Sequence, residues 1–347
     1  MQNVSDIIKW YKKNFRILPW RETKDPYKIW ISEVILQQTQ IVTGVDYYHK
    51  FILKFPHIKA LASSNEETIL KLWQGLGYYS RARNLHKTAK IISDSYDGTF
   101  PSNYKQLIKL PGIGDYTASA ILSFAFDQPF PVLDGNVFRV LSRLYQIELP
   151  IDVPANRKVF MEILNQMISN QNPILFNNAM MELGAVICKP DNPKCDQCPV
   201  AVHCLSRKNG VHTQLPIKSK LMQKRTRYFN YVYIRYNNSF YLVQRIKKDI
   251  WQNLYELPLI ESEKEILTSK DLLNGLSELI TNTDTFSPFP QISLKHILTH
   301  QEIKAKFWVI KTNEKPNFLM NGCLKVTDEN YTKYPIPVLI SKFLLSL

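Results

Sequence analysis

The chain has no apolar run that approaches the roughly 20 residues needed to cross a bilayer, so we expect a soluble protein. It contains no internal repeat and no low-complexity segment. No stretch has a coiled-coil pattern, so we expect a monomer. Met1 leads directly into a polar helix start, with no apolar leader before it. We therefore expect a reducing compartment.

Cysteine is scarce as well, with five residues in 347. Four of them follow the pattern Cys188-x6-Cys195-x2-Cys198-x5-Cys204, whereas Cys323 lies far away. Cys195 and Cys198 flank a predicted tight turn, so the sulfur atoms of this loop can converge on one metal centre. In a reducing compartment, clustered thiols indicate metal ligands more than disulfides. The spacing leaves structural zinc and a [4Fe–4S] cluster equally open, with disulfides as a third alternative.

Acidic residues are outnumbered, 30 against 44 Lys and Arg, which gives a net charge of +14. Residues 1–227 hold 30 Lys and Arg against 18 Asp and Glu, whereas residues 228–347 hold 14 against 12. Residues 207–227 carry seven basic side chains, no acidic one, and the breakers Gly210 and Pro216. We interpret this segment as a basic linker. A surplus confined to one part suggests contact with a polyanion, and solubility is the alternative.

The length predicts two domains, and the hydrophobic pattern changes between them. Before the linker, apolar residues recur at helical spacing, and Ser5 is expected to cap the first helix, with Ile8, Tyr11 and Phe15 as its apolar stripe. After the linker, the pattern is that of strands. The further helices are expected over residues 30–42, 66–76, 81–96, 104–109, 116–126 and 156–170, and the strands over 228–236, 240–243 and 306–310. An all-helical, metal-bearing domain is therefore expected before a smaller domain of mixed helices and strands.

The segment Leu110-Pro-Gly-Ile-Gly-Asp115 joins two of the expected helices. The first ends at Pro111 and the second begins at about Asp115. Gly112 and Gly114 are expected to adopt backbone angles that a β-carbon forbids. The amides at these glycines and at the helix start would point outward and suit a phosphate. An ordinary helix–helix turn is the alternative.

This hairpin, followed by Val132-Leu-Asp134-Gly-Asn136-Val, resembles the helix-hairpin-helix–Gly/Pro–Asp motif of the endonuclease III-like DNA glycosylases. That superfamily often carries the same four-cysteine spacing after the hairpin. The resemblance therefore implies a [4Fe–4S] cluster, rather than zinc, on Cys188, Cys195, Cys198 and Cys204. It covers residues 1–206, with a helical lobe over 20–135 and a cluster lobe made of 1–19 and 136–206.

Position 116 is where bifunctional members of the superfamily place a Schiff-base lysine, and here it is Tyr116, which cannot form an imine. Residues 30–40, Leu18-Pro-Trp20-Arg21 and residues 75–83 resemble adenine DNA glycosylases of the MutY type. The resemblance implies a monofunctional enzyme that removes adenine opposite 8-oxoguanine or guanine in double-stranded DNA. It further implies a bacterial, cytoplasmic protein associated with the nucleoid.

Cleavage of an N-glycosidic bond needs a better leaving group and a stabilised sugar cation, which two carboxylates of different pKa can supply. Glu33 lies in a mostly apolar helix, where burial would raise its pKa and keep a proton for adenine N7. Asp134 lies in a polar turn with amide donors, which is expected to keep it ionised. Without the resemblance, Glu33 would be interpreted as an exposed helix glutamate, and Asp134 as a turn residue or a helix cap.

The resemblance assigns supporting roles by position. Tyr116 and Asn136 would orient Asp134 and a water molecule. The expected adenine pocket is lined by Trp20, Arg21, Leu36 and Asn178. The residues expected beside the opposite base are Gln38, Thr39, Leu76 and Tyr78. Lys189 and Lys194 of the cysteine loop would face phosphates, and redox sensing by the cluster is a further hypothesis.

Residues 228–347 resemble the Nudix-like domain of the MutY family, mainly through Trp251-Gln-Asn-Leu-Tyr-Glu256-Leu-Pro258. Glu261, Glu263 and Glu265 do not form an Arg-Glu-x-x-Glu-Glu array, so we expect no hydrolase activity from this domain. Leu298-Thr299-His300 matches a family Phe-Ser-His loop that contacts 8-oxoguanine, with threonine keeping the hydroxyl and leucine losing the aromatic ring. A metal pair of His296 and His300 is not expected.

Two rival functions are consistent with parts of the pattern. One is a bifunctional pyrimidine glycosylase–lyase, against which Tyr116 argues. The other is a non-catalytic DNA-binding or iron–sulfur redox module. The pairing of Glu33 with Asp134 argues against that second rival, because binding alone requires no paired carboxylates.

Overall fold

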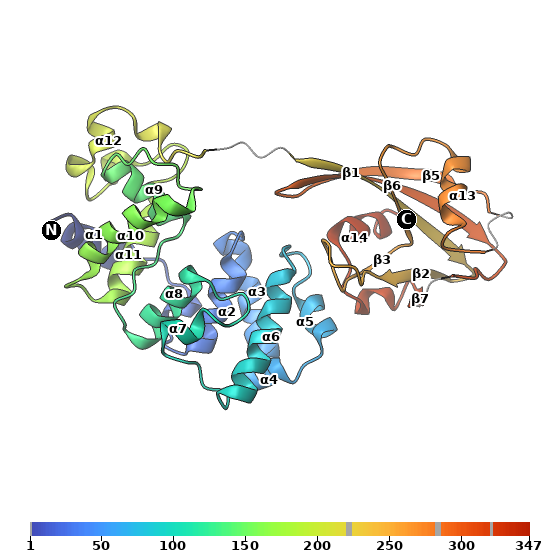
Figure 1. Cartoon of the computed structure of the whole chain (residues 1–347), viewed down its shortest axis with the longest axis horizontal. Helices are drawn as coiled ribbons and strands as arrows, with labels where there is room; N and C mark the ends of the chain where they lie inside the picture. The colour runs from blue at the N-terminus through green and yellow to red at the C-terminus, as the bar shows by residue number, and fades with distance from the viewer. Residues whose placement is uncertain (1, 220–223, 282–285, 320–321) are drawn as a thin grey trace. The chain divides into compact units, whose positions relative to one another are not determined.

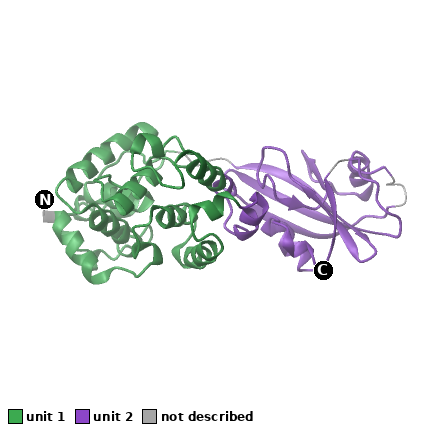
Figure 2. Ribbon diagram, turned by 90° about the horizontal axis from the view of Figure 1, so that it is seen from below, with its two compact units in different colours: residues 1–63, 84–221 green, residues 64–83, 222–347 purple. Residues whose placement is uncertain are grey.

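The computed structural model describes residues 2–219, 224–281, 286–319 and 322–347 (Figure 1). The chain divides into two compact units (Figure 2). Unit 1 comprises Met1–Ser63 and Asn84–Leu221, and unit 2 comprises Ser64–Arg83 and Met222–Leu347. The domain boundaries at residues 206 and 228 stay predictions. Among the described residues, no helix is long and apolar enough to cross a membrane.

Unit 1 is helical, as the sequence predicts, and α6 (Ser80–Ser95) crosses its boundary at residue 83. Its other longer helices are α1 (Gln2–Asn14), α2 (Pro26–Leu36), α3 (Ile41–Lys54), α8 (Asp115–Phe126), α9 (Gly135–Leu144), α10 (Arg157–Ile168) and α11 (Pro173–Val186). Its shorter helical segments include η1 (Pro19–Arg21), α4 (Ile58–Ala62), α7 (Tyr104–Leu107), η2 (Pro154–Asn156), η3 (Cys195–Gln197), η4 (Ala201–His203), α12 (Leu205–Lys208) and η5 (His212–Gln214).

Two local predictions in this unit were wrong. The expected helix over residues 30–42 is interrupted, because α2 ends at Leu36 and α3 begins at Ile41. Between them Gln38 adopts a positive φ of 59° and the Thr39 amide donates to the Leu36 carbonyl, which closes a turn. Ser5 lies inside α1 and therefore does not cap it. The helices α3, α9 and α11 were not predicted as separate elements.

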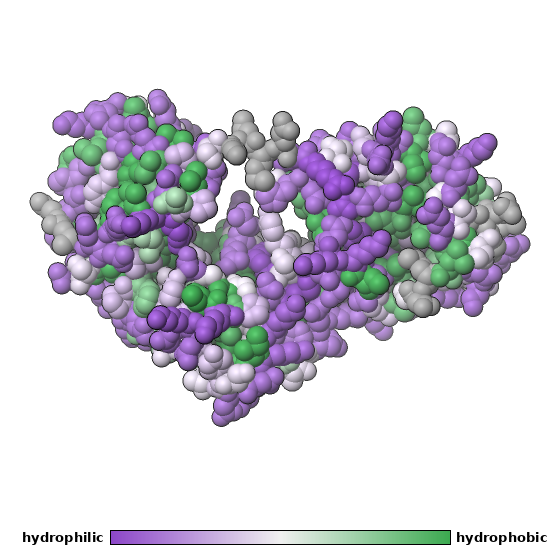
Figure 3. Space-filling model, in the orientation of Figure 1, coloured by the Kyte–Doolittle hydropathy of each residue, from purple (hydrophilic) through white to green (hydrophobic). Residues whose placement is uncertain are grey.

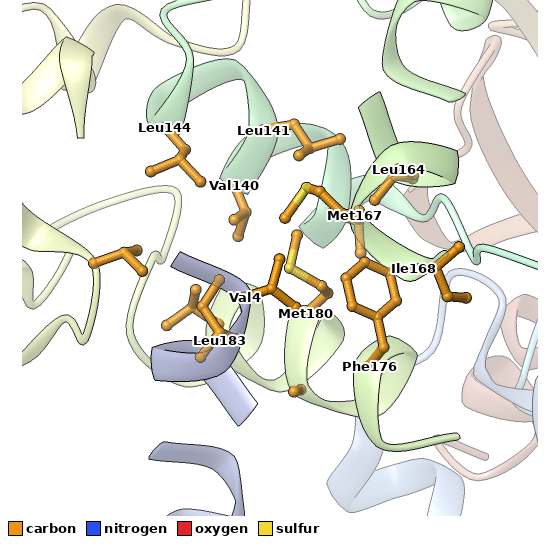
Figure 4. Packing of buried hydrophobic residues seen from close by; sticks show 14 of the residues in the cluster. Val4, Val140, Leu141, Leu144, Leu164, Met167, Ile168, Phe176, Met180 and Leu183 are labelled. Carbon is orange, nitrogen blue, oxygen red and sulfur yellow. The ribbon is translucent and has the colours of Figure 1, made fainter. Parts of the chain in front are cut away.

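The N-terminal helix α1 shares a hydrophobic core with α9, α10 and α11 (Figure 4). Phe160, Phe176 and Leu164 of this core are at most 1% exposed. Burying one such side chain contributes roughly 1.5–3 kcal/mol. Cys188, Cys198 and Cys204 are partly buried and pack against the same cluster. The core therefore anchors both the start of α9 and the cysteine loop.

The hairpin before α8 confirms one glycine expectation and corrects the other. Gly112 has a φ of 78°, and an added β-carbon there would lie 2.8 Å from Cβ of Asn84. Gly114 caps α8 with a φ of −97°, which any residue can adopt, and an added β-carbon would meet no atom within 4 Å. Gly112 is thus required by the turn, whereas Gly114 keeps open the space in front of the helix start.

Unit 2 contains a seven-stranded mixed sheet in the order β3-β2-β1-β6-β5, with β4 paired to β1 and β7 to β2. Its central strands β1 and β6 are parallel, and the other pairs are antiparallel. The strands are β1 (Arg225–Tyr236), β2 (Ser239–Gln244), β3 (Tyr255–Glu256), β4 (Leu259–Ser262), β5 (Phe289–Ile297), β6 (Gln301–Thr312) and β7 (Cys323–Thr327).

Alternate residues of β1 and β6 pack on opposite faces of this sheet, as the strand period requires. On one face, Val232 and Trp308 form a core with Leu272 of α13 (Ser269–Leu276). On the other, Phe307 stacks on Phe343 of α14 (Val338–Leu344), with ring centroids 4.3 Å apart. The expected strands over 228–236, 240–243 and 306–310 lie within β1, β2 and β6, which are longer than predicted.

The segment 64–83, which includes α5 (Glu66–Leu72), packs against this sheet domain within unit 2. The Asn253 amide donates to Glu66, and the Tyr255 hydroxyl donates to Glu67 over 3.1 Å. Arg83 donates to the Gln252 carbonyl over 3.0 Å. The surface drawn in Figure 3 is mostly hydrophilic, with smaller hydrophobic groups in between.

Candidate active site

A cavity of about 340 Å³ lies in unit 1. Its walls come from the segment around η1 and from α2 and α11, so residues far apart in sequence share it. Four residues expected in the adenine pocket line it, together with both Glu33 and Asn136. Those four are Trp20, Arg21, Leu36 and Asn178. The Asn178 amide donates to the Ile174 carbonyl over 3.0 Å, which orients that side chain.

Glu33 lies on α2, a helix that is apolar nearly all round and is therefore buried. The residue is only 4% exposed, so the expectation of burial was right and that of an exposed helix glutamate was wrong. Tyr116, on the packed helix α8, donates its hydroxyl to Glu33 Oε2 over 2.5 Å. Burial raises the pKa of Glu33 to about 7, against the Tyr116 hydrogen bond, which lowers it. The nearby Asp134 raises this pKa further, and Arg21 lowers it.

Asp134 caps α9 and is also part of this site. Its Oδ1 accepts from the Val137 amide over 2.7 Å, and its Oδ2 accepts from the Asn136 side-chain amide over 2.8 Å. Burial raises the pKa of Asp134, although these hydrogen bonds and Arg139 act to lower it. Burial thus outweighs the donors in the direction of this pKa shift, and the expectation that Asp134 is ionised stays a prediction. The cap and the site thus use the same carboxylate.

Asn136 links Asp134 to the cysteine loop through Arg139. The Arg139 guanidinium donates to Asn136 Oδ1 over 2.8 Å and to the Cys188 carbonyl over 2.7 Å. It also donates to the Gly184 carbonyl at the end of α11 over 2.8 Å. The Arg139 side chain therefore links the start of α9, the end of α11 and the first cysteine through hydrogen bonds.

Glu182 and its partner Arg16 also line the cavity, and the sequence reasoning missed both. Glu182 on α11 is fully buried, and it accepts from Arg16 Nε over 2.5 Å and from Arg21 Nη2 over 2.7 Å. Burial alone raises the pKa of Glu182, but the hydrogen bonds and charges of both arginines bring it below its usual range. The available signal was the same as for Glu33, namely a single acidic residue in a largely apolar or neutral helix.

The four clustered cysteines lie on one loop that follows α11 and leads to α12. All five cysteines of the chain belong to the described residues, and all have free thiols. Arg143 of α9 donates to Cys188 Sγ over 3.5 Å, and the Cys204 thiol donates to the Arg143 carbonyl over 3.3 Å. Cys195 and Cys198 flank the short η3 turn, as predicted. Burial raises the pKa of Cys198 to about 11, and the charges of the other three thiolates add to this effect.

Within the described ranges, no three His, Cys, Asp or Glu side chains form a group that could hold a metal ion. A single zinc ion requires four sulfur atoms at about 2.3 Å from one point. In a [4Fe–4S] cluster, by contrast, each of four thiolates binds a different iron atom, so the sulfurs are spread around the cluster. The four thiols on one loop are a soft donor set that fits either structural zinc or a [4Fe–4S] cluster, and Arg143 contacts two of them.

The residues expected to meet DNA in unit 1 lie outside the cavity lining. Gln38 and Thr39 form the turn after α2, and Gln38 is exposed there. Gly112 and Gly114 lie at the start of α8, where no side chain caps the helix. Lys194 is exposed and Lys189 partly exposed on the cysteine loop.

In unit 2 the structure brings together residues that are far apart in sequence. Tyr78 is 48% exposed, and its hydroxyl forms a hydrogen bond with that of Thr299. Thr299 and the exposed His300 lie in the turn between β5 and β6, where the Leu298 amide donates to the Gln301 carbonyl over 2.8 Å. Leu76, on the same segment as Tyr78, is buried. Tyr78, which is expected beside the opposite base, thus contacts the loop that is expected to meet 8-oxoguanine.

The segment Trp251 to Pro258 is mostly a turn, with only Tyr255 and Glu256 in a strand. Glu256 is buried and ion-paired to Arg245 over 2.8 Å. Glu261 accepts from Arg227 over 2.6 Å. Glu256 and Glu261 are therefore both engaged with arginines.

Comparison with known proteins agrees with this geometry. Residues 31–166 match the family of HhH-GPD superfamily base excision DNA repair proteins, and residues 230–346 match the NUDIX domain. The chain is 43% identical over 312 residues to the adenine DNA glycosylase of Buchnera aphidicola subsp. Baizongia pistaciae. The matched region covers 88% of this chain and 85% of that relative.

Solved structures support the fold of the helical region. A thermostable thymine-DNA glycosylase superposes with a TM-score of 0.55 at 29% identity, covering 59% of this chain and 95% of the other. Endonuclease III, trapped in a covalent intermediate with DNA, superposes with a TM-score of 0.53 at 23% identity, covering 60% and 95% respectively. Because it shares sequence over most of its length with a curated relative, the chain belongs to the adenine DNA glycosylases, hydrolases of N-glycosidic bonds in base excision DNA repair.

Proposed function

We propose that this chain removes adenine opposite 8-oxoguanine or guanine in double-stranded DNA, by hydrolysis and without cutting the backbone. The observation that carries the proposal is the contact of Tyr116 with the buried Glu33 beside Asp134, at a cavity of about 340 Å³. A base inside a duplex cannot reach a buried acid, so the adenine must leave the helix to react.

Glu33 acts as the general acid in this proposal. With a pKa of about 7, it is half protonated at neutral pH, whereas an ordinary glutamate is almost fully ionised. Proton transfer to adenine N7 makes the base a better leaving group. Burial raises the pKa of Tyr116 far above its usual value, so the phenol remains a neutral donor that orients Glu33.

Asp134 supplies the negative charge that stabilises the oxocarbenium-like sugar or captures it. The Val137 and Asn136 donors hold the carboxylate at the start of α9 and favour its ionised form. Asn136 lines the cavity, so its amide is also placed to orient a water molecule. The two carboxylates are thus held by different partners and take different roles.

The proposal of hydrolysis without strand cutting rests on Tyr116, which contacts Glu33 and cannot form an imine. Tyr116 takes the place of the Schiff-base lysine. Lys24 lines the cavity, but its side chain is 65% exposed and forms an ion pair with Asp127 over 2.6 Å. A charged, solvated ammonium is a poor nucleophile. Borohydride trapping on abasic DNA tests this point, and a covalent adduct would support the bifunctional rival.

Cys188, Cys195, Cys198 and Cys204 would hold a [4Fe–4S] cluster. When bound, the cluster would fix the shape of the loop that carries Lys189 and Lys194. Their ammonium groups would then meet phosphates, as would the amides near Gly112 and Gly114. Broad visible absorption and four iron atoms per chain are expected, whereas a colourless, zinc-loaded protein would contradict this assignment.

Lesion reading is proposed for unit 2. The Thr299 hydroxyl, in contact with Tyr78, and the exposed His300 would meet the base opposite adenine, as would Leu76 of the same unit. In unit 1, Gln38 and Thr39 are proposed separately as residues that contact the DNA. Single-turnover excision from matched duplexes with 8-oxoguanine or guanine opposite adenine tests the whole proposal. Free adenine with an intact strand is expected, and faster with 8-oxoguanine. No adenine release from either duplex would refute it.

A further inference from the structure

Glu182 is the only charged residue of α11, and it is fully buried at the wall of the base cavity. Arg16 donates hydrogen bonds to both of its carboxylate oxygen atoms, from Nε to Oε1 over 2.5 Å and from Nη2 to Oε2 over 2.9 Å. Arg21 donates to Oε2 from its own Nη2 over 2.7 Å. A buried carboxylate with two guanidinium partners is costly to assemble, and nothing in the proposed chemistry so far uses it.

The contacts restrain Arg21 on several sides. Besides Glu182, its guanidinium donates to the Arg16 carbonyl over 3.1 Å and lies over the Tyr11 ring, 5.7 Å from the centroid. Its side chain is only 13% exposed and lines the same cavity as Glu33. A cation in this place would act on Glu33 through a water-poor region, where charges interact strongly.

We propose that Glu182 is a positioning residue that fixes the Arg21 guanidinium in the wall of the base cavity and neutralises its charge beside the general acid. The proposal rests on the general-acid role of Glu33 given above. With Glu182 ionised, Arg16, Arg21 and Glu182 together carry one positive charge; without it they carry two.

The effect of losing Glu182 on the pKa of Glu33 follows from the groups that face Glu33. Tyr116 of α8, Asp134 at the start of α9 and Arg21 of η1 all act on its pKa. Arg21 lowers that pKa, and the opposite charge of Glu182 limits this effect. Removing Glu182 should therefore lower the pKa of Glu33, so that the acid loses its proton at a lower pH.

The test is the pH dependence of single-turnover adenine excision by the full chain, measured for the wild type and Glu182→Gln. In the wild type, the rate should fall above about pH 7. In E182Q this alkaline limb should move down by roughly one pH unit. Arg16→Met is the matched control, because it breaks the same ion-pair group but leaves Arg21 neutralised. For R16M, the pH above which the excision rate falls should be unchanged or higher than in the wild type.

If Glu182 served folding alone, the excision rates of both variants would change. The pH at which the rate falls would then not differ between E182Q and R16M. An E182Q limb at the wild-type pH, or an equal downward shift in R16M, overturns the proposal. Circular dichroism checks that the variants fold. Arg21→Met provides a second measurement, since loss of the cation itself must raise the limb, and an unmoved limb in R21M also overturns the proposal. If the wild type releases no adenine at all, the proposed function fails instead.

Discussion

Replacing Glu33 with glutamine should stabilise the protein at alkaline pH while removing activity. The pKa of Glu33 is about 7 in the folded chain, against an ordinary value of 4.5. At 1.36 kcal/mol for each pKa unit, this difference corresponds to about 3 kcal/mol. The folded state binds the proton more tightly than the unfolded state. The stabilising contribution is therefore complete below pH 4.5 and is lost as the pH rises through 7.

Glutamine has no proton to lose, so E33Q escapes this loss. Its free energy of unfolding, relative to that of the wild type, should be roughly 2–3 kcal/mol larger at pH 8.5 than at pH 5. Urea unfolding followed by the helical circular dichroism signal measures both values. Single-turnover excision should fall at least about a hundredfold, the usual worth of a general acid.

Glu22→Gln is the matched control for this measurement. Glu22 lines the same cavity but is exposed, so the substitution removes the same charge without relieving a buried one. Its effect on the free energy of unfolding should be about the same at both pH values. A difference between E33Q and wild type that does not change with pH would refute the reasoning, because it would mean that Glu33 ionises as easily in the fold as in water.

Four further predictions concern the other groups of the site. Asp134→Asn should slow single-turnover excision at least about a hundredfold while duplex affinity in a gel-shift assay stays within a few-fold; a fully active variant would remove its assigned role. Tyr116→Phe removes a hydrogen bond that lowers the pKa of Glu33, so the alkaline limb of the excision rate should rise by about one pH unit, and a downward move would contradict that contact. Thr299→Ala should reduce the preference for 8-oxoguanine over guanine by about tenfold in paired rate measurements, and an unchanged ratio would exclude this hydroxyl as the reader. Cys198→Ser should lose most of the bound iron and visible absorption in an iron assay, whereas full iron content would show that this thiol is not a ligand.

The sequence predicted much of the fold because its patterns are local. Helical spacing located most of α6, α8 and α10, and alternation located β1, β2 and β6. The break at Gln38 was missed because its apolar neighbours continue the helical spacing, while the left-handed turn follows from backbone hydrogen bonds that no periodicity records. The order of the strands depends on pairings between distant segments, so it also could not be read from the sequence.

In the candidate site, too, local patterns identified some residues, whereas the roles of others depend on contacts between distant segments. Glu33 was identified because a charged residue in an apolar helix is a local signal. Glu182 gives that signal too, but its meaning depends on Arg16 and Arg21, which lie more than 160 positions away in the sequence. For Asp134 the polar turn was evident, whereas the burial that raises its pKa comes from tertiary packing. The partners of Glu182 and the burial of Asp134 thus depend on long-range packing, which the local sequence does not reveal.

The pH dependence of single-turnover adenine release by the wild-type chain, between pH 6 and pH 9, tests the central claim most directly. If a buried Glu33 gives its proton to the base, the rate constant should be nearly level below pH 7 and fall about tenfold for each pH unit well above it. A rate constant that stays level up to pH 9 would contradict the account, because an ionised Glu33 has no proton to give.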